Sequence, residues 1–530
     1  MTKKPYSISA GELAARGPER IPEAFVPNCH LIYSSPATLF YNSPGAIGFG
    51  VKRAGLVIPE SVMLLVSPGC CGRNSTILSA EEGYADRMFY LLMDETDLVT
   101  GRHLKKIPEA VAEILETAKP RPKVVLICIT CVDALLGTDL ERVCREAREK
   151  TGVTVVPSYM YALEREGRKP PMAAIRQTVY SLLEPAEGRK DPRMVNLMGF
   201  FSALDPESDL IALLKQAGIR RVNQVAEMNT LDEYREMSRA NFNLMLHPES
   251  RFAAEDLQNR LGMPYIEFPR LFAPEKIHRM YQLLGAAVGV TFRDEVYYEA
   301  AKAARDRFKA ARKGTRFAVG EVMNGNPYEM AASLTEMGME VPTIFANLTP
   351  DDFPFLGRLA RRSPETRIYT GIDPSMVWYR PEEASPVDIT VGKDAGGYYP
   401  GVPNLEWNSE KEPFGFKGFT DFINGLEEVL ALKDYIAICP RRLRTSPERF
   451  PFCSNWGASS SSPMPAAAPA TSADSTSPAG LRRAAPYIPP DSGIWTRFWG
   501  GMTGCWRKSA GPLRIWTRIS SPSSARLFPR

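Results

Sequence analysis

Short apolar runs alternate with longer amphipathic stretches through most of the 530-residue chain. Runs such as SVMLLVS (61–67), KVVLICIT (123–130) and MVNLMGF (194–200) have the length of strands and stay apolar at successive positions. Amphipathic stretches such as DLERVCREAREKTG follow them and end in glycine, as helices often do. Apolar strands that alternate with such helices predict parallel sheets covered by helices on both faces.

The candidate strands fall into three groups along the chain. A charged helical stretch, RDEVYYEAAKAARDRFKAARKG, separates the second group from the third. We therefore predict an α/β protein with three Rossmann-like lobes at 50–190, 191–310 and 311–440, preceded by an N-terminal segment, 1–49. The remaining candidate strands are VTVVPS (153–158), RRVNQVA (220–226), FNLMLH (242–247), MPYIEFP (263–269), RFAVGEV (316–322), VPTIFAN (341–347), RIYTGI (367–372) and PVDITVG (386–392).

The composition changes at about residue 441. The stretch SSSSPMPAAAPATSADSTSPAG has the composition of a disordered segment. The residues after it mix Trp, Arg, Ser and Pro without helical or strand periodicity. Residues 441–530 are therefore expected to form an irregular tail. This tail is either a disordered basic extension or the product of a shifted reading frame. Its mixture of residues without periodicity favours a shifted reading frame.

Composition restricts the class of protein further. Hydrophobic residues make up 44% and charged residues 24%, as in soluble globular proteins, and the net charge of +4 implies no nucleic-acid partner. The sequence contains no apolar run of membrane-spanning length, and its first residues lack a secretory apolar core. Nine widely spread cysteines argue against a disulfide framework and favour a cytoplasmic location.

Several catalytic motifs are missing from the sequence. It contains no G-x-x-x-x-G-K-[ST], so an ATP-hydrolysing P-loop is not expected in this chain. It has four histidines and neither an H-E-x-x-H nor a G-x-S-x-G motif, which excludes zincin-type and α/β-hydrolase-type chemistry.

The cysteines are the most informative candidates. Cys70 and Cys71 follow the strand 61–67 in SPGCCGRN, and Cys131 follows the next predicted strand, 123–130. Loops after parallel strands can bring such thiols together, and thiolates are the usual ligands of iron–sulfur clusters.

Three other interpretations of the cysteines stay open. They could be buried core residues, a zinc site that adds Cys128, or a C-x-x-C redox pair formed by Cys128 and Cys131. The redox pair is disfavoured because Cys128 lies inside the predicted strand. Cys128 and Cys144 are expected to pack as small hydrophobic residues.

Six pieces of sequence, in this order, resemble the nitrogenase component 1 family over roughly residues 30–435. They are LLVSPGC, ETDLVTGRHLKKIPEAVAEI, KVVLICITCVDALLGTDLERV, FNLMLHPESRFAAEDLQNRLGMPYIEFPRLFAPEKIHRM, RFAVGEVMNGNPYEMAASLTEMGMEV and PFGFKGFTDFINGL. The family includes nitrogenase subunits, their assembly scaffolds and the catalytic subunits of dark-operative protochlorophyllide reductase.

The resemblance implies a metal site. The family's interface-cluster cysteines correspond to Cys70, or its neighbour Cys71, and to Cys131. The cluster would be a [4Fe–4S] cluster or a larger one. Members usually carry a third cysteine about 25 residues before the glycine turn, but YNSPGAIG has none there. Cys29 is the only upstream cysteine, so Cys29, Cys71, a non-cysteine ligand or a partner's thiol could complete the set.

The resemblance also implies a second cofactor or substrate region, near His247 and segment 404–412. The lobe-two cysteine that holds the nitrogenase cofactor corresponds within a residue to His247. The lobe-three histidine falls near Asn404–Trp407, where the sequence has no histidine. His247 is either a ligand or a strand-end histidine bonded to backbone, and authentic nitrogen fixation is not expected. A second metallocofactor or a tetrapyrrole would fit the family.

The leading hypothesis is a subunit of a nitrogenase-like oxidoreductase with an unknown substrate and unassigned catalytic residues. Its implied partners are a second component 1-type subunit and an ATP-dependent [4Fe–4S] iron-protein reductase. The interface cluster would receive electrons from that reductase. The alternatives are a scaffold for metallocluster assembly and a cluster-free α/β binding protein.

Overall fold

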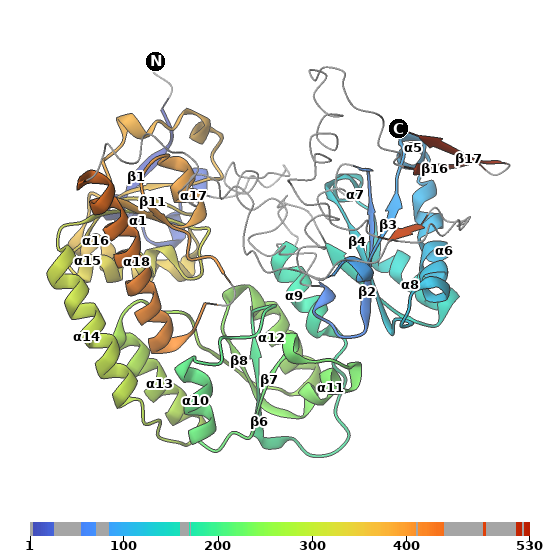
Figure 1. The fold of residues 1–530 in the computed structure, drawn as a ribbon, viewed down its shortest axis with the longest axis horizontal. Coiled ribbons are helices and arrows are strands. Elements are labelled where there is room, and N and C mark those ends of the chain that lie inside the picture. The colour runs from blue at the N-terminus through green and yellow to red at the C-terminus, as the bar shows by residue number, and fades with distance from the viewer. Residues whose placement is uncertain are drawn as a thin grey trace.

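The computed structural model describes residues 4–25, 55–69, 84–159, 169, 171–409, 412–438, 481–483, 516–521 and 524–529. Within these ranges the chain forms three α/β lobes, each built on its own mainly parallel sheet (Figure 1). The predicted fold class is therefore confirmed. In the described part of the chain, no helix is long and apolar enough to span a bilayer.

Lobe I is built on a five-stranded sheet of order β15-β3-β2-β4-β5, in which only β15 runs antiparallel to its neighbour. Every residue of β2 and β4 is buried, because helices cover both faces of these strands. The elements are β2 (Ser61–Ser67), β3 (Met88–Leu92), α5 (Glu95–Thr100), α6 (Arg102–Thr117), β4 (Val124–Ile129), α7 (Cys131–Leu136), α8 (Leu140–Thr151), β5 (Thr154–Tyr159), α9 (Pro171–Ser181) and β15 (Leu481–Arg483).

The two faces of this sheet pack into different cores. Val62 and Leu64 face α6 and α8, where Cys144 is buried. Met63 on the other face packs in one cluster with Cys128, α9 and part of lobe II. Both thiols are therefore small core side chains, as predicted.

Lobe II has four parallel strands in the order β7-β6-β8-β9. A ladder of buried amides crosses it: Asn223 Nδ2 donates to Asn196 Oδ1 at 2.8 Å, and Asn196 Nδ2 donates to Asn243 Oδ1 at 2.9 Å. These residues are directly paired in the sheet, so the ladder fixes the strand register. The elements are β6 (Asp191–Met198), α10 (Asp209–Gln216), β7 (Arg221–Gln224), α11 (Leu231–Glu236), β8 (Ala240–Met245), α12 (Arg251–Leu261), β9 (Tyr265–Glu267) and α13 (Pro274–Val288).

Lobe III has six strands in the order β1-β12-β11-β10-β13-β14. The first strand, β1, joins its edge antiparallel to β12, which the sequence analysis did not predict. The elements are β1 (Ser7–Ser9), α1 (Ala10–Arg16), α14 (Glu295–Arg312), β10 (Arg316–Gly320), α15 (Pro327–Glu336), β11 (Glu340–Phe345), α16 (Phe353–Arg362), β12 (Arg367–Tyr369), β13 (Ile389–Val391), α17 (Lys393–Tyr398), β14 (Asn404–Leu405) and α18 (Gly415–Ile438).

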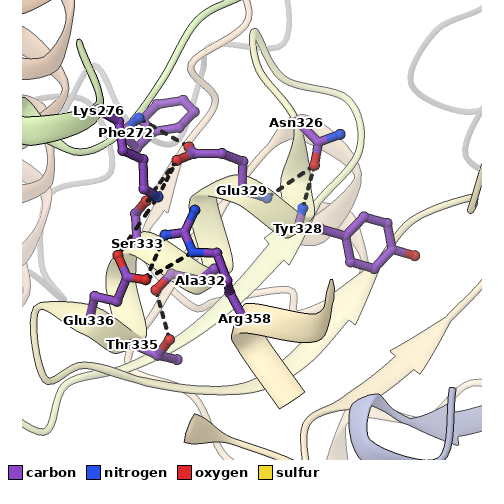
Figure 2. A network of polar contacts seen from close by, with 10 residues as sticks. All are labelled: Phe272, Lys276, Asn326, Tyr328, Glu329, Ala332, Ser333, Thr335, Glu336 and Arg358. Atoms are coloured by element: carbon purple, nitrogen blue, oxygen red, sulfur yellow. Dashed lines mark hydrogen bonds and ion pairs between the residues drawn. The ribbon is translucent and has the colours of Figure 1, made fainter. Parts of the chain in front are cut away.

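A polar network joins lobes II and III (Figure 2). The fully buried Glu329 of α15 accepts hydrogen bonds from Lys276 Nζ of α13 at 2.6 Å and from the Phe272 N–H at 3.0 Å. Ser333 Oγ donates to the same carboxylate at 2.9 Å. Because one hydrophobic core also runs through both lobes, the described residues of lobes II and III form one packed unit.

The buried Asp394 at the start of α17 makes stability depend on pH. Its carboxylate accepts from the N–H groups of Glu321 and Val322 at 3.0 and 3.1 Å. Burial nevertheless raises the pKa of Asp394 to about 6, against about 3.9 in an unfolded chain. The folded chain then binds this proton more tightly than the unfolded chain does. The contribution of Asp394 to stability should therefore grow as the pH falls from about 6 to about 4.

Asp394→Asn should remove that dependence. The measurement is the free energy of unfolding in denaturant at pH 4.5 and pH 7 for the parent chain and the variant. We expect the parent chain to gain stability relative to the variant at pH 4.5. A difference that is the same at both pH values would contradict the assignment.

Of residues 441–530, the structure describes only β15, β16 (Trp516–Ser521) and β17 (Ser524–Pro529), the last two paired antiparallel. The origin of the tail and the domain boundaries proposed from the sequence remain predictions.

Candidate functional site

The backbone of lobe I brings two of the predicted cysteine segments to one edge. β2 and β4 are parallel neighbours, with Val66 paired to Ile129, so the chain leaves both strands at the same end of the sheet. Cys131 begins α7 at this edge. Cys29, Cys70 and Cys71 lie outside the described residues, as does the side chain of Cys131, so their role as ligands stays a prediction.

A buried polar network lies beside this edge. Asp97 of α5 accepts from Arg102 Nε at 2.7 Å and from Lys106 Nζ at 3.0 Å. His103, which follows Arg102 in α6, is also buried. Its Nδ1 lies 3.1 Å from the Asp97 carbonyl oxygen, and its Nε2 lies 3.1 Å from Oδ1 of the buried Asp133 in α7.

Both ring nitrogens of His103 therefore face oxygen acceptors. A neutral imidazole can donate at only one nitrogen, so this arrangement needs an imidazolium or a protonated Asp133. Burial alone would lower the pKa of His103, but the bonds to Asp133 and to the Asp97 carbonyl outweigh it and raise the pKa. When His103 is protonated, its ring can donate to both oxygens.

Three buried side-chain oxygens at this edge have no hydrogen-bond partner within the described part of the chain. They are Ser67 Oγ at the end of β2, Thr130 Oγ1 just after β4, and Asp133 Oδ2. Such atoms are rare in proteins and commonly mark a functional site or a bound group. Together with the nearby thiol-bearing segments, they are chemically compatible with a cluster at this edge.

The same edge carries apolar side chains that the described residues leave uncovered. Val99 of α5 is 88% exposed, and Leu135 and Leu136 of α7 are 64% and 55% exposed. Exposed apolar side chains that gather in one place are typical of protein interfaces.

His247, the second predicted site residue, lies at the end of β8. Gly199, with φ 132°, allows the two backbone segments to approach closely. A Cβ at residue 199 would lie 2.7 Å from the backbone nitrogen of His247. The imidazole Nδ1 accepts from the Glu249 N–H at 3.3 Å. Burial, and next the positive charge of Arg176, lower the pKa of His247 to about 4, so the ring is neutral at pH 7.

This hydrogen bond decides the tautomer of His247. With Nδ1 as an acceptor, Nε2 carries the hydrogen and can donate but cannot bind a metal ion. His247 is thus a strand-end histidine bonded to backbone, and its role as a cofactor ligand stays a prediction. Metal binding through Nε2 would require the other tautomer and the loss of the Glu249 bond.

Segment 404–407, where the family's lobe-three histidine falls, approaches the same region. The Arg270 guanidinium lies 6.0 Å from the ring centre of Phe200, which contacts the His247 ring, and 5.9 Å from that of Trp407. Burial lowers the pKa of Arg270 to about 10, so the group stays charged at pH 7. Arg270 Nε and Trp407 Nε1 lack hydrogen-bond partners in the described residues. The structure thus brings His247 and segment 404–407 together around a buried cation.

The sequence analysis missed His103, Asp133, Arg176 and Arg270. Within the described residues, no group of three or more His, Cys, Asp or Glu side chains could hold a metal ion. The thiols of Cys128 and Cys144 are buried in the core of lobe I, and burial raises the pKa of Cys144 to about 12.

Residues 48–431 match the family model described as nitrogenase component 1 type oxidoreductase. The chain belongs to this family. Membership confirms the resemblance seen in the sequence and agrees with the three-lobed fold. The solved structure titled nitrogenase Cp1 at pH 6.5 has a TM-score of 0.57 and 14% identity, and the match covers 79% of this chain and 97% of that one. At this identity the likeness concerns the fold alone.

Curated relatives of this component 1 type chain include two nitrogenase iron-molybdenum cofactor biosynthesis proteins NifE. The protein of Nostoc sp. (strain PCC 7120) is 28% identical over 261 residues, which cover 46% of this chain and 53% of that protein. The protein of Rhodobacter capsulatus is 28% identical over 323 residues, which cover 56% of this chain and 66% of that protein. The chain thus spans about half to two thirds of the length of these relatives.

Proposed function

We propose that this component 1-type chain is a scaffold that holds a metal–sulfur cluster during its assembly and then releases it. The observation that carries the proposal lies at the two positions where the family anchors its cofactor. At one, Nδ1 of His247 already accepts a hydrogen bond from the Glu249 N–H. At the other, the segment Asn404–Trp407 contains no histidine.

The region around these residues suits a weakly held anion. Arg270 is buried and charged, and its Nε joins Trp407 Nε1 as an unused donor in the described residues. Metal–sulfur clusters with thiolate ligands are commonly anionic, so buried donors and cations can hold one without a covalent bond. The biosynthesis proteins among the relatives point the same way.

In lobe I, the cysteines Cys70, Cys71, Cys131 and Cys29 would hold a separate iron–sulfur cluster, which supplies electron transfer when bound. The exposed Val99, Leu135 and Leu136 fit a second component 1-type subunit covering this edge. This arrangement favours a second candidate function, a reductase subunit fed by an ATP-dependent iron protein.

The test is to purify the full chain anaerobically with its partner subunit and load it with iron and sulfide. A scaffold is expected to bind iron, to pass labelled iron to an acceptor protein, and to reduce no substrate with an iron-protein reductase and ATP. Iron retained through repeated turnover would favour the reductase. Less than about one iron per chain would overturn both functions.

A further inference from the structure

The described side chains of the short helix α7 contribute little apolar packing to lobe I. Leu135 and Leu136 in its last turn point away from the core and are mostly exposed. Asp133 in the same helix is fully buried and lies two residues after Cys131. Its Oδ1 accepts from Thr138 Oγ1 at 2.7 Å, and its carbonyl oxygen accepts from the Thr138 N–H at 3.1 Å. These bonds stay within the segment 133–138, so the polar contact that the structure shows between the Asp133 side chain and another element of lobe I is the one to His103.

His103 joins Asp133 to a rigid part of the fold. Its Nε2 meets Asp133 Oδ1 while its Nδ1 meets the Asp97 carbonyl oxygen. Asp97 is itself fixed, because it forms a capping box with Asp94 and ion pairs with Arg102 and Lys106. The ring is therefore held at both nitrogens, and a movement of α7 away from α6 would break the contact with Asp133.

We propose that His103 is a positioning residue that acts through Asp133 to fix the Cys131 end of α7. The role of Cys131 as a ligand rests on the proposed function, whereas the tether itself does not. Metal ligands must be held to within about 0.5 Å of their working geometry by supporting hydrogen bonds. The tether supplies that support where apolar packing does not.

The first test follows backbone motion in the metal-free chain by amide hydrogen exchange of peptides covering 131–138. His103→Leu removes both donors and is expected to speed exchange there at least about tenfold. His103→Gln keeps one donor and should show a smaller effect. The matched control is His278→Leu, because His278 forms a similar pair with Asp294 at 2.8 Å in lobe II. It should leave 131–138 unchanged.

Unchanged exchange of 131–138 in His103→Leu would overturn the tether whether or not the parent chain binds iron. If His103→Leu does not fold, His103→Phe takes its place, because phenylalanine fills the same space without a nitrogen donor, and the same faster exchange of 131–138 is expected.

The second test uses the iron-loaded chain at equal iron content. The electron paramagnetic resonance spectrum of the reduced cluster is expected to shift in His103→Gln and not in His278→Gln. An unchanged spectrum in His103→Gln would show that His103 does not position a cluster ligand. If the parent chain binds no iron, the proposed function is refuted, but the hydrogen-exchange result still tests the tether.

Discussion

Replacing Cys131 with alanine is expected to remove most of the protein-bound iron. Iron–sulfur clusters are held by cysteine thiolates, and loss of one ligand from a small set usually destabilises the whole cluster. Iron content after anaerobic reconstitution and gel filtration measures the effect. We expect at least about a fivefold loss relative to the parent chain.

The chain offers two matched controls for this prediction. Cys128→Ala and Cys144→Ala remove thiols that are buried in the core of the same lobe, and the Cys144 thiol stays protonated because burial raises its pKa to about 12. Both should keep most of the iron. If Cys131→Ala retains as much iron as these two variants, Cys131 is not a ligand.

Replacing Glu329 with alanine is expected to lower the free energy of unfolding by about 1–3 kcal/mol, the usual cost of leaving a buried polar group without its partner. The change would leave Lys276 without its 2.6 Å ion pair and the buried Phe272 N–H without its acceptor (Figure 2). Glu329 lies in lobe III, whereas Lys276 and Phe272 lie in lobe II. The unfolding of the two lobes should therefore become less cooperative. Denaturant unfolding with fluorescence and circular dichroism measures both effects.

Glu336→Ala is the control on the same helix. Glu336 also pairs with Lys276, at 3.7 Å, and with Arg358 at 2.5 Å, but its side chain is partly exposed. Solvent screening limits such pairs to about 1 kcal/mol or less. Equal losses in the two variants would show that burial of Glu329 is not what makes the network stabilising.

Most of the strands in the structure were predicted from the sequence. β2 matches its predicted range of 61–67, and the strands around it differ by a few residues. β1 was missed because it has only three residues, of which Ile8 alone is buried, and because it is paired to β12 far along the chain. β3, the run MFYLL, was also missed, although it is as apolar as its neighbours.

The candidate sites were predictable to different degrees. Cysteines that directly follow predicted strands can be recognised in the sequence. In a parallel sheet the ends of neighbouring strands lie at one edge, so such cysteines are expected to lie near one another. His103 could not be found this way, because it stands in the charged stretch RHLKK and resembles an exposed helix residue. Only tertiary structure shows that its partner is Asp133, which lies 30 positions further on. The tautomer of His247 likewise depends on a backbone N–H whose direction the sequence does not reveal.

The edge strand β1 has a consequence for synthesis on the ribosome. Ser7–Ser9 leave the exit tunnel long before Arg367–Tyr369, with which they pair. At roughly 5–20 residues per second, this first strand waits on the order of 20–70 s for its partner. During that time the sheet of lobe III cannot be completed, and a newly made chain carries an unpaired segment that chaperones could bind. The sheet of lobe III is therefore completed only after its C-terminal strands have been made.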